Sequence, residues 1–256
     1  MARVYNYWLS GKDNFSADRV AGEETIAAFP GIRLSAHANR AFLQRTVHYL
    51  ARSEGVRQFL DIGVGLPSAS NTHEVTQAVA RESRVVYVDN DPLVLAHARA
   101  LLTSSPEGVT AFLDADLRDT DTILEQAAET LDFTRPVGVM LLAILHYIPD
   151  LTEARRIVAR LMEAVPAGSF LVISHAATDL LPDEVTAFEK TLNAHLPAEH
   201  HHVARSRELV TSFFDSVRLV EPGLVRVSDW RPEAPEDAAV PTILWGGVAR
   251  KPAGGT

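Results

Sequence analysis

The sequence contains no cysteine, and it has fewer basic than acidic residues. Without cysteine the chain can form no disulfide, no thiolate metal site and no cysteine nucleophile, which fits a reducing cytoplasm. Its 24 lysine and arginine residues against 33 aspartate and glutamate residues give a net charge of −9. Nucleic-acid binding relies on clustered basic residues that displace counterions from phosphates. The charge therefore argues against a nucleic-acid partner and favours a small-molecule substrate.

Long hydrophobic runs are also missing. The longest uninterrupted one is VGVMLLAIL, residues 137–145, which is too short to span a bilayer. The N-terminus has no basic region followed by an apolar stretch, so we expect no secretion signal, no membrane partner and a cytoplasmic location. With 256 residues, 46% of them hydrophobic, the chain is long enough for one α/β domain with a substantial core.

Five apolar runs of strand length alternate with helical patterns, at residues 57–63, 84–89, 110–116, 137–145 and 169–174. This alternation predicts a mostly parallel sheet, with the fourth and fifth runs at its centre. Two later runs, at 210–222 and 242–251, predict an antiparallel C-terminal edge. We expect one domain, 1–256, in which residues 1–55 form an N-terminal helical lid and 56–256 the core. The second lid helix is predicted to start at a Ser35 cap.

The first predicted strand runs into DIGVG, residues 61–65, a turn with two glycines. In a doubly wound sheet the ligand lies beyond the carboxyl ends of the strands, and glycines there let the backbone approach it closely. Asp89 ends the next strand, 24 residues beyond Gly65. A carboxylate at that place can accept both hydrogen bonds of a ribose diol.

The third strand is expected to end at Asp116, which can accept a hydrogen bond from an exocyclic amine such as that of adenine, while Leu117 packs against the ring. Each of these acids could instead cap the helix that follows it, which is the interpretation we prefer for Asp91. Three consecutive strand ends that deliver a glycine turn, Asp89 and Asp116 in that order favour an adenosine ligand.

The loop after the glycine turn distinguishes between adenosine ligands. A dinucleotide site requires G-x-G-x-x-G and a helix that starts at once, but Ser68 stands at the third glycine position. Asn71 and Glu74 have the spacing of a capping box, which would delay the helix to about Thr72. This loop suits a pyrophosphate poorly. Asp61 completes D-x-G-x-G, which resembles motif I of class I S-adenosylmethionine (SAM) dependent methyltransferases.

The resemblance extends to nearly the whole chain. It is carried by ARVYNYWLSGKDNF, RQFLDIGVGLPS, VVYVDNDPLVLAHARALL, ADLRD, LLAILHYIPD, GSFLVISH, VEPGLV and GGVARKP, which are similar to an actinobacterial family of uncharacterised S-adenosyl methyltransferases once catalogued as a domain of unknown function. The resemblance implies a Rossmann-like class I methyltransferase fold and SAM as cofactor, without a defined acceptor. The residues then expected to bind SAM are Asp61, Gly63, Val64, Gly65, Asp89, Asn90, Asp116, Leu117 and Arg40.

Arg40, on the helix before the first strand, is expected to pair with the methionyl carboxylate, unless it is a solvated surface residue. Methyl transfer needs proximity, and a general base only where the acceptor must lose a proton. His146 and Tyr147, at the end of the fourth run, are expected to face the cleft. His146 is the first candidate for a base or an acceptor-orienting group, or else a structural histidine bonded to the backbone. His175 is the second candidate.

Two further stretches could belong to the site. Residues 4–15, VYNYWLSGKDNF, supply aromatic and polar side chains that could close over a ligand or simply pack onto the domain, namely Tyr5, Tyr7, Trp8, Lys12 and Asn14. The run HHH at 200–202 is predicted to be a solvated loop, because adjacent histidines cannot all face one ion, and no metal is expected.

The sequence therefore predicts a SAM-dependent methyltransferase with a small-molecule acceptor, and an apolar lid face that could pair two chains as a homodimer. Two alternatives stay open, a non-catalytic SAM-binding regulator and an NAD-dependent oxidoreductase. The missing third glycine already disfavours the oxidoreductase. A hydrolase has no support because no G-x-S-x-G elbow is present.

Overall fold

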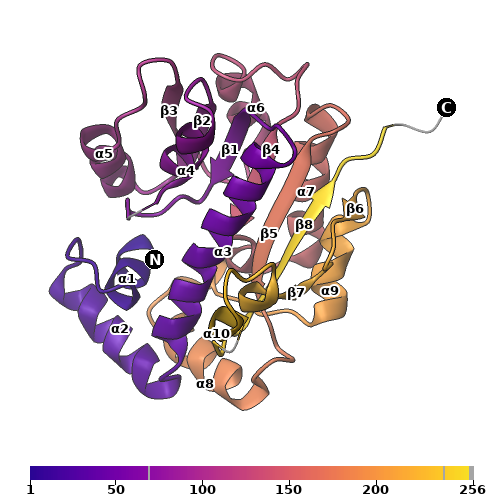
Figure 1. Cartoon of the computed structure of the whole chain (residues 1–256). Coiled ribbons are helices and arrows are strands. Elements are labelled where there is room, and N and C mark those ends of the chain that lie inside the picture. The colour runs from indigo at the N-terminus through magenta and orange to yellow at the C-terminus, as the bar shows by residue number, and fades with distance from the viewer. Residues whose placement is uncertain (69, 239, 254–256) are drawn as a thin grey trace.

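The computed structural model describes residues 1–68, 70–238 and 240–253. Within them, strands form one sheet in the order β3-β2-β1-β4-β5-β8-β6, and β7 pairs with β8 (Figure 1). Neighbours among β1 to β5 run parallel, whereas β8 is antiparallel to β5, β6 and β7. The predicted parallel sheet with an antiparallel C-terminal edge is confirmed. The strands are β1 Gln58–Ile62, β2 Arg84–Asp89, β3 Val109–Asp114, β4 Gly138–Leu142, β5 Phe170–Ala176, β6 Arg218–Leu219, β7 Val225–Arg226 and β8 Leu244–Arg250.

Helices precede the sheet and connect its strands. The α-helices are α1 Ala2–Trp8, α2 Ser16–Ala28, α3 Ile32–Arg52, α4 Thr72–Val79, α5 Pro92–Leu101, α6 Thr120–Ala127, α7 Leu151–Ala164, α8 Pro182–Asn193, α9 Arg207–Thr211 and α10 Pro235–Ala238. Short 3-10 turns are η1 Leu145–Tyr147, η2 Ala198–His200, η3 Ser212–Phe214 and η4 Val227–Asp229. None of the helices in the described part of the chain combines the length and apolar character needed to cross a bilayer.

N-cap residues that the sequence predicted determine where the crossover helices begin. The Asp91 carboxylate accepts a hydrogen bond from the backbone N–H of Leu93 at 2.9 Å, and Pro92 occupies the first helical position of α5. The predicted capping box of Asn71 and Glu74 opens α4. Both helices therefore start only after a short loop beyond the strand, which leaves room at the carboxyl end of the sheet.

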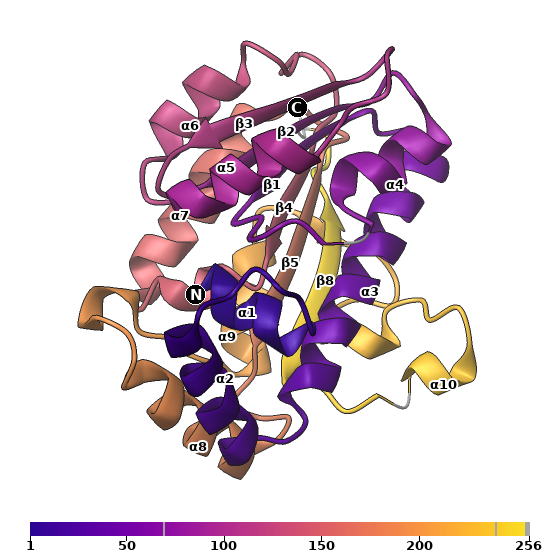
Figure 2. The same cartoon turned by 90° about the vertical axis from the view of Figure 1, so that its left-hand side faces the viewer.

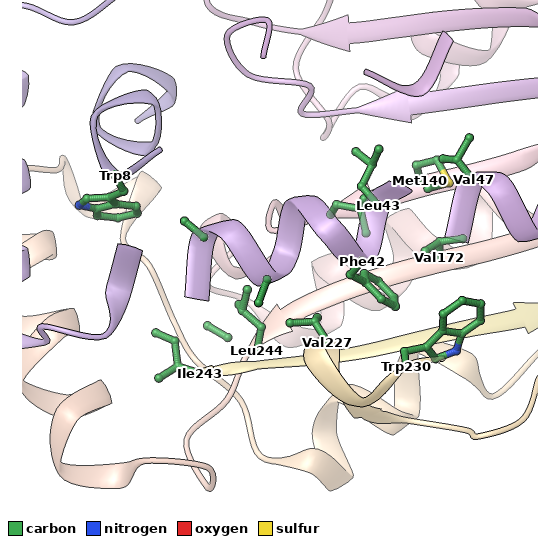
Figure 3. Close-up of a cluster of buried hydrophobic side chains, with 14 of the residues drawn as sticks. Trp8, Phe42, Leu43, Val47, Met140, Val172, Val227, Trp230, Ile243 and Leu244 are labelled. Carbon is green, nitrogen blue, oxygen red and sulfur yellow. The ribbon is translucent and has the colours of Figure 1, made fainter. Parts of the chain in front are cut away.

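The central strands are buried on both faces, as their unbroken apolar runs predicted. Alternate residues point to opposite sides, so Phe59 of β1 joins the core beneath α3 while Leu60 joins the core beneath α6 and α7. Figure 3 shows Leu43 and Val47 of α3 beside Met140 of β4 in the first of these cores. This packing fixes α3 across the sheet, next to the first strand turn.

Two sequence expectations were wrong in detail. Ser35 does not cap α3, which begins at Ile32; it is buried and its hydroxyl bonds Thr242 Oγ1 at 2.9 Å. The run 210–222 is mostly helical, in α9 and η3, and contributes only the two-residue strand β6. Its apolar residues Val210, Phe213 and Phe214 follow helical spacing, so they bury one face against the sheet.

Residues 1–55 were predicted to form the lid, but α3 of this segment packs against the sheet, so the term lid is kept for α1 and α2, which Figures 1 and 2 both place beside α8. Arg3 of α1 donates to the Asp18 carboxylate of α2 at 3.0 Å and to the Asp91 carboxylate at 3.4 Å. Since Asp91 caps α5, which follows β2, these two bonds connect the lid to the carboxyl end of the sheet.

Candidate active site

A cavity of about 420 Å³ lies at the carboxyl end of the sheet. It sits where the strand order reverses between β1 and β4, the position at which doubly wound sheets bind ligands. The lid, α3, the turn after β1, the end of β2, η1 and the loop after α8 all contribute to its walls. All of the residues that the sequence predicted as SAM ligands line it, as do His146 and Tyr147. Their convergence on one cavity is the geometry that the strand-end pattern predicted.

The turn after β1 depends on its two glycines. Gly63 and Gly65 have φ angles of 76° and 65°, in the left-handed region that favours glycine. A Cβ on Gly63 would lie 2.6 Å from the Ile144 side chain, whereas one on Gly65 would meet nothing within 4 Å. The backbone N–H of Gly65 donates to Asp89 Oδ2 at 2.9 Å. The turn and the end of β2 thus hold each other in place.

Asp89 is oriented from two sides, because its Oδ1 also accepts the N–H of Asp91 at 3.0 Å. It is not a helix cap, since Asp91 caps α5. Burial raises the pKa of Asp89, while the two backbone N–H donors oppose that rise. Each carboxylate oxygen has a further lone pair, so the group can still accept hydrogen bonds from a ligand.

Asp61 lies deeper, almost fully buried at the end of β1. Thr72 donates its hydroxyl to Asp61 Oδ2 at 2.6 Å. Burial raises the pKa of Asp61 to about 6, against the hydrogen bond from Thr72 and the positive charge of Arg40. Arg40 donates to the carbonyl of Ser70 at 3.2 Å. Arg40 therefore lies against the loop that connects β1 to α4. It is not the solvated surface residue that we considered as the alternative.

Asp116 lies two residues beyond the end of β3, not at the strand end itself. Its Oδ1 accepts the N–H of Arg118 at 2.8 Å and its Oδ2 accepts the amide of Asn90 at 3.2 Å. The α6 cap is Asp119, so Asp116 is not a helix cap either. Leu117 beside it is buried in the cavity wall. Asp89, Asn90 and Asp116 consequently form one polar, acidic end of the cavity.

The opposite end of the cavity is aromatic. Tyr5 and Trp8 of α1 are 6.0 Å apart between ring centroids, and Trp8 lies 5.7 Å from Phe188 of α8. All three line the cavity. The other predicted lid contacts lie elsewhere: Tyr7 bonds the Glu23 carboxylate, Lys12 is exposed, and Asn14 bonds Asn6 within the α1–α2 turn. Two of the five lid residues therefore belong to the cavity.

Comparison with known proteins identifies this arrangement. Residues 1–252 match the model of a family described as S-adenosyl methyltransferase. The chain belongs to the S-adenosyl methyltransferase family. It is a SAM-dependent methyltransferase, as the resemblance in its sequence predicted. Comparison with curated proteins finds no match.

Solved structures support this assignment over the whole chain. A DUF574 family protein from Streptomyces avermitilis MA-4680 is 42% identical, with a TM-score of 0.93 over 98% of this chain and 97% of that one. A Thermobifida fusca YX protein is 38% identical, with a TM-score of 0.90 over 99% and 95%. The plantazolicin methyltransferase BpumL, 10% identical, shares the fold alone, with a TM-score of 0.57 over 98% and 95%.

The cavity of this methyltransferase fits SAM. Asn39 of α3 lines it and is 4% exposed, yet its Oδ1 has no hydrogen-bond partner among the described residues. A buried acceptor without a donor costs about 1 to 3 kcal/mol, which a ligand N–H would offset. The acidic end, the open space at Gly65 and this orphan acceptor suit a ligand with ribose hydroxyls and an ammonium group. When bound, SAM supplies an electrophilic methyl group.

The candidate bases at the aromatic end differ in what their ring nitrogens contact. His146 is buried, and its Nδ1 accepts the N–H of Ala176 at 3.4 Å. Burial, followed by the neighbouring His202, lowers the pKa of His146 well below its ordinary value. A neutral imidazole bonded in this way is a weak base. The geometry favours an orienting or structural role for His146.

His175 does not line the cavity. Its Nδ1 donates to the carbonyl of Ala176 at 2.8 Å, and its Nε2 accepts from Arg205 at 2.7 Å. Burial lowers the pKa of His175 to about 3. Because both ring nitrogens are occupied within the protein, we assign His175 a structural role and no longer regard it as a candidate base.

The prediction of a solvated histidine loop was wrong for His202, which is 3% exposed. His200 ends η2 and His202 lies two residues further on; both line the cavity, and His201 between them does not. Three identical neighbours in the sequence give no signal of which side chain is buried. No group of residues in the described ranges could hold a metal ion.

Proposed function

We propose that this methyltransferase acts on a small molecule, which binds at the aromatic end of the cavity while SAM occupies the acidic end. The observation that carries the proposal is that one cavity is lined both by carboxylates at the ends of β2 and β3 and by aromatic side chains of α1 and α8. A volume of about 420 Å³ lies in the range of small-molecule sites, about 300 to 1,000 Å³. The lid closes the aromatic half, so a polymer would have to displace α1.

The acidic half supports one orientation of SAM. Asp89, held by two N–H donors, is assigned to the ribose diol, as in other doubly wound sheets. Asp116 and Leu117 are assigned to the adenine amine and ring. Val64 and the two glycines bring backbone close to the methionyl tail, with Arg40 positioned near its carboxylate. The methyl group would then face the aromatic half.

The chain's own contribution to the reaction is proximity and alignment. An in-line displacement at a methyl group requires the acceptor atom about 3 to 3.5 Å from the carbon and opposite the leaving sulfur. Tyr5, Trp8 and Phe188 provide a flat apolar surface for the acceptor, and the lid excludes water. Tyr147, half-buried in η1, also lines the cavity.

Calorimetry with S-adenosylhomocysteine (SAH) and NADH tests the SAM half. We expect SAH to bind with a stoichiometry of one and NADH not to compete, and absence of SAH binding would contradict the proposal. Incubation with methyl-labelled SAM and a cell extract tests the acceptor half. Label is expected in the low-mass fraction, whereas label confined to protein or nucleic acid would contradict a small-molecule acceptor. No transfer to any fraction would favour a non-catalytic SAM-binding protein.

The cytoplasmic location, an actinobacterial origin, the single-domain division into lid and core, and homodimer formation stay predictions.

A further inference from the structure

A histidine and a glutamate outside the predicted site residues form a pair at the aromatic end. His202 Nδ1 lies 2.9 Å from Glu189 Oε1, and the His202 backbone is held by Asn193 through hydrogen bonds of 2.7 and 2.9 Å. Glu189 also accepts the N–H of Ala204. A carboxylate can only accept, so Nδ1 carries the proton and Nε2 carries a lone pair. The imidazole is thus fixed in position and in tautomer.

The free lone pair is available to a ligand. Nε2 of His202 has no hydrogen-bond partner within residues 1–68, 70–238 and 240–253, and the residue lines the cavity. The ring lies 4.2 Å from His146, 5.6 Å from Tyr147 and 5.4 Å from Phe188 between centroids. It is therefore part of the aromatic surface that faces an acceptor.

We propose that His202, oriented by Glu189, is the general base that removes the proton of a hydroxyl acceptor, and that the acceptor is an uncharged planar compound of the phenol class. This inference rests on the proposed function, because it places the acceptor at the aromatic end. His202 would be a catalytic residue, and Glu189 a positioning residue.

The charge distribution distinguishes a hydroxyl from an amine acceptor. The carboxylates that line the cavity, Asp61, Asp89, Asp91 and Asp116, belong to the turn and strand ends of the acidic half. The cavity-lining rings within 6 Å of the His202 ring are those of His146, Tyr147 and Phe188, and Glu189, which bonds Nδ1, is not part of the lining. A protonated amine would meet no carboxylate there. An uncharged phenol matches the rings, and its hydroxyl, with a pKa near 10, benefits from a base.

The step balances without a further reactant. The acceptor O–H proton passes to Nε2 of His202 as the new O–CH3 bond forms and the C–S bond of the methyl donor breaks, with that electron pair staying on sulfur. The Glu189 carboxylate stabilises the resulting imidazolium. The proton then leaves to solvent, which returns His202 to its starting form.

The test uses acceptor probes with the full-length enzyme, namely the phenols catechol and 7-hydroxycoumarin against benzylamine and 2-phenylethylamine, which are protonated at neutral pH. We expect O-methylated products from the phenols and at least tenfold slower transfer to the amines. His202→Gln should lower kcat by about 10² to 10⁴-fold with SAH affinity unchanged. His201→Gln is the matched control, because that side chain does not line the cavity, and it should retain wild-type kcat.

The pH dependence of kcat distinguishes a catalytic His202–Glu189 pair from a purely structural one. Glu189→Gln should lower kcat about tenfold or more, leave KM within threefold, and move the acid limb of the kcat profile. The titratable and charged groups near His202 are Glu189, His146, Tyr147 and His175, with Arg205 behind His175. The same profile for wild type and Glu189→Gln would overturn the positioning role.

The outcomes separate this inference from the proposed function. Preferred methylation of the amines, no phenol product despite SAH binding, or a His202→Gln enzyme with wild-type kcat would each overturn the inference while the SAM site stands. Failure to bind SAH would instead remove the proposed function. If His202→Gln does not fold, nitrogen-15 NMR of the wild type decides: a proton on Nδ1 of His202 supports the pair, and a proton on Nε2 overturns it.

Discussion

The buried carboxyl group of Asp61 should make the enzyme less stable at neutral pH than an Asp61→Asn variant. Burial raises its pKa from 3.8 to about 6 in the folded protein. A group whose folded pKa exceeds its unfolded value stabilises the fold when protonated, and that contribution is lost as pH rises through the interval between the two values. The wild type should therefore lose stability from this group between about pH 4 and pH 6.

The magnitude follows from the shift. One pKa unit corresponds to about 1.4 kcal/mol, so the rise in the pKa of Asp61 lowers the free energy of unfolding by about 3 kcal/mol once the carboxyl is fully ionised. Asparagine keeps an oxygen that can accept the Thr72 hydroxyl bond of 2.6 Å but avoids the buried charge. Allowing for relaxation around the new amide, we expect the free energy of unfolding of Asp61→Asn to exceed that of the wild type by about 1 to 3 kcal/mol at pH 7.5 and to match it near pH 3.5, below the unfolded pKa.

Urea denaturation of both proteins at several pH values measures this difference. His146 and His175, whose pKa values burial lowers, lose stabilising contributions as pH falls below the ordinary histidine range. They are present in both proteins, so their effect cancels in the comparison. Asp114→Asn, an exposed position at the end of β3, is the control and should show no such trend. A wild type more stable than Asp61→Asn at pH 7.5, or a stability difference independent of pH, would contradict this prediction.

Two further variants test the loops around the cavity. Gly65→Ala should cost about 1 to 2 kcal/mol of folding stability, because its φ of 65° is unfavourable for alanine even though the added Cβ would have open space. Stability equal to that of the wild type in urea would contradict this. Arg205→Met should cost at least about 3 kcal/mol of folding stability in the same assay, because each buried acceptor left without a donor costs about 1 to 3 kcal/mol. A loss under about 1 kcal/mol would contradict this. The carbonyls that lose this donor are those of Leu145, Ile148 and Pro149.

Local features of the chain were predictable from sequence because local chemistry determines them. The strand runs, the Asp91 cap and the Asn71 capping box each depend on residues a few positions apart, and all three are present. Their order also placed the glycine turn, Asp89 and Asp116 at one edge of the sheet. The family resemblance then supplied the cofactor.

Features that depend on distant contacts were missed. His202 is buried because α8 and η1 meet around it, and its partner Glu189 lies on a helix that only tertiary packing brings there. Ser35 similarly serves a bond to Thr242 near the C-terminus instead of a local cap. The structural role of His175 required Arg205, which reaches it only in the folded chain. Sequence pattern specifies which residues can do chemistry, while packing decides which of them face the cavity.

The assignment of the acidic end to an adenosyl group is tested most directly by SAH titration of the wild type and Asp89→Ala in a calorimeter, with circular dichroism to confirm that both are folded. We expect the wild type to bind SAH and Asp89→Ala to bind it more weakly by about 1 to 3 kcal/mol, roughly 5- to 150-fold, because the ribose hydroxyls lose their acceptor. Equal affinity in the two folded proteins would contradict it.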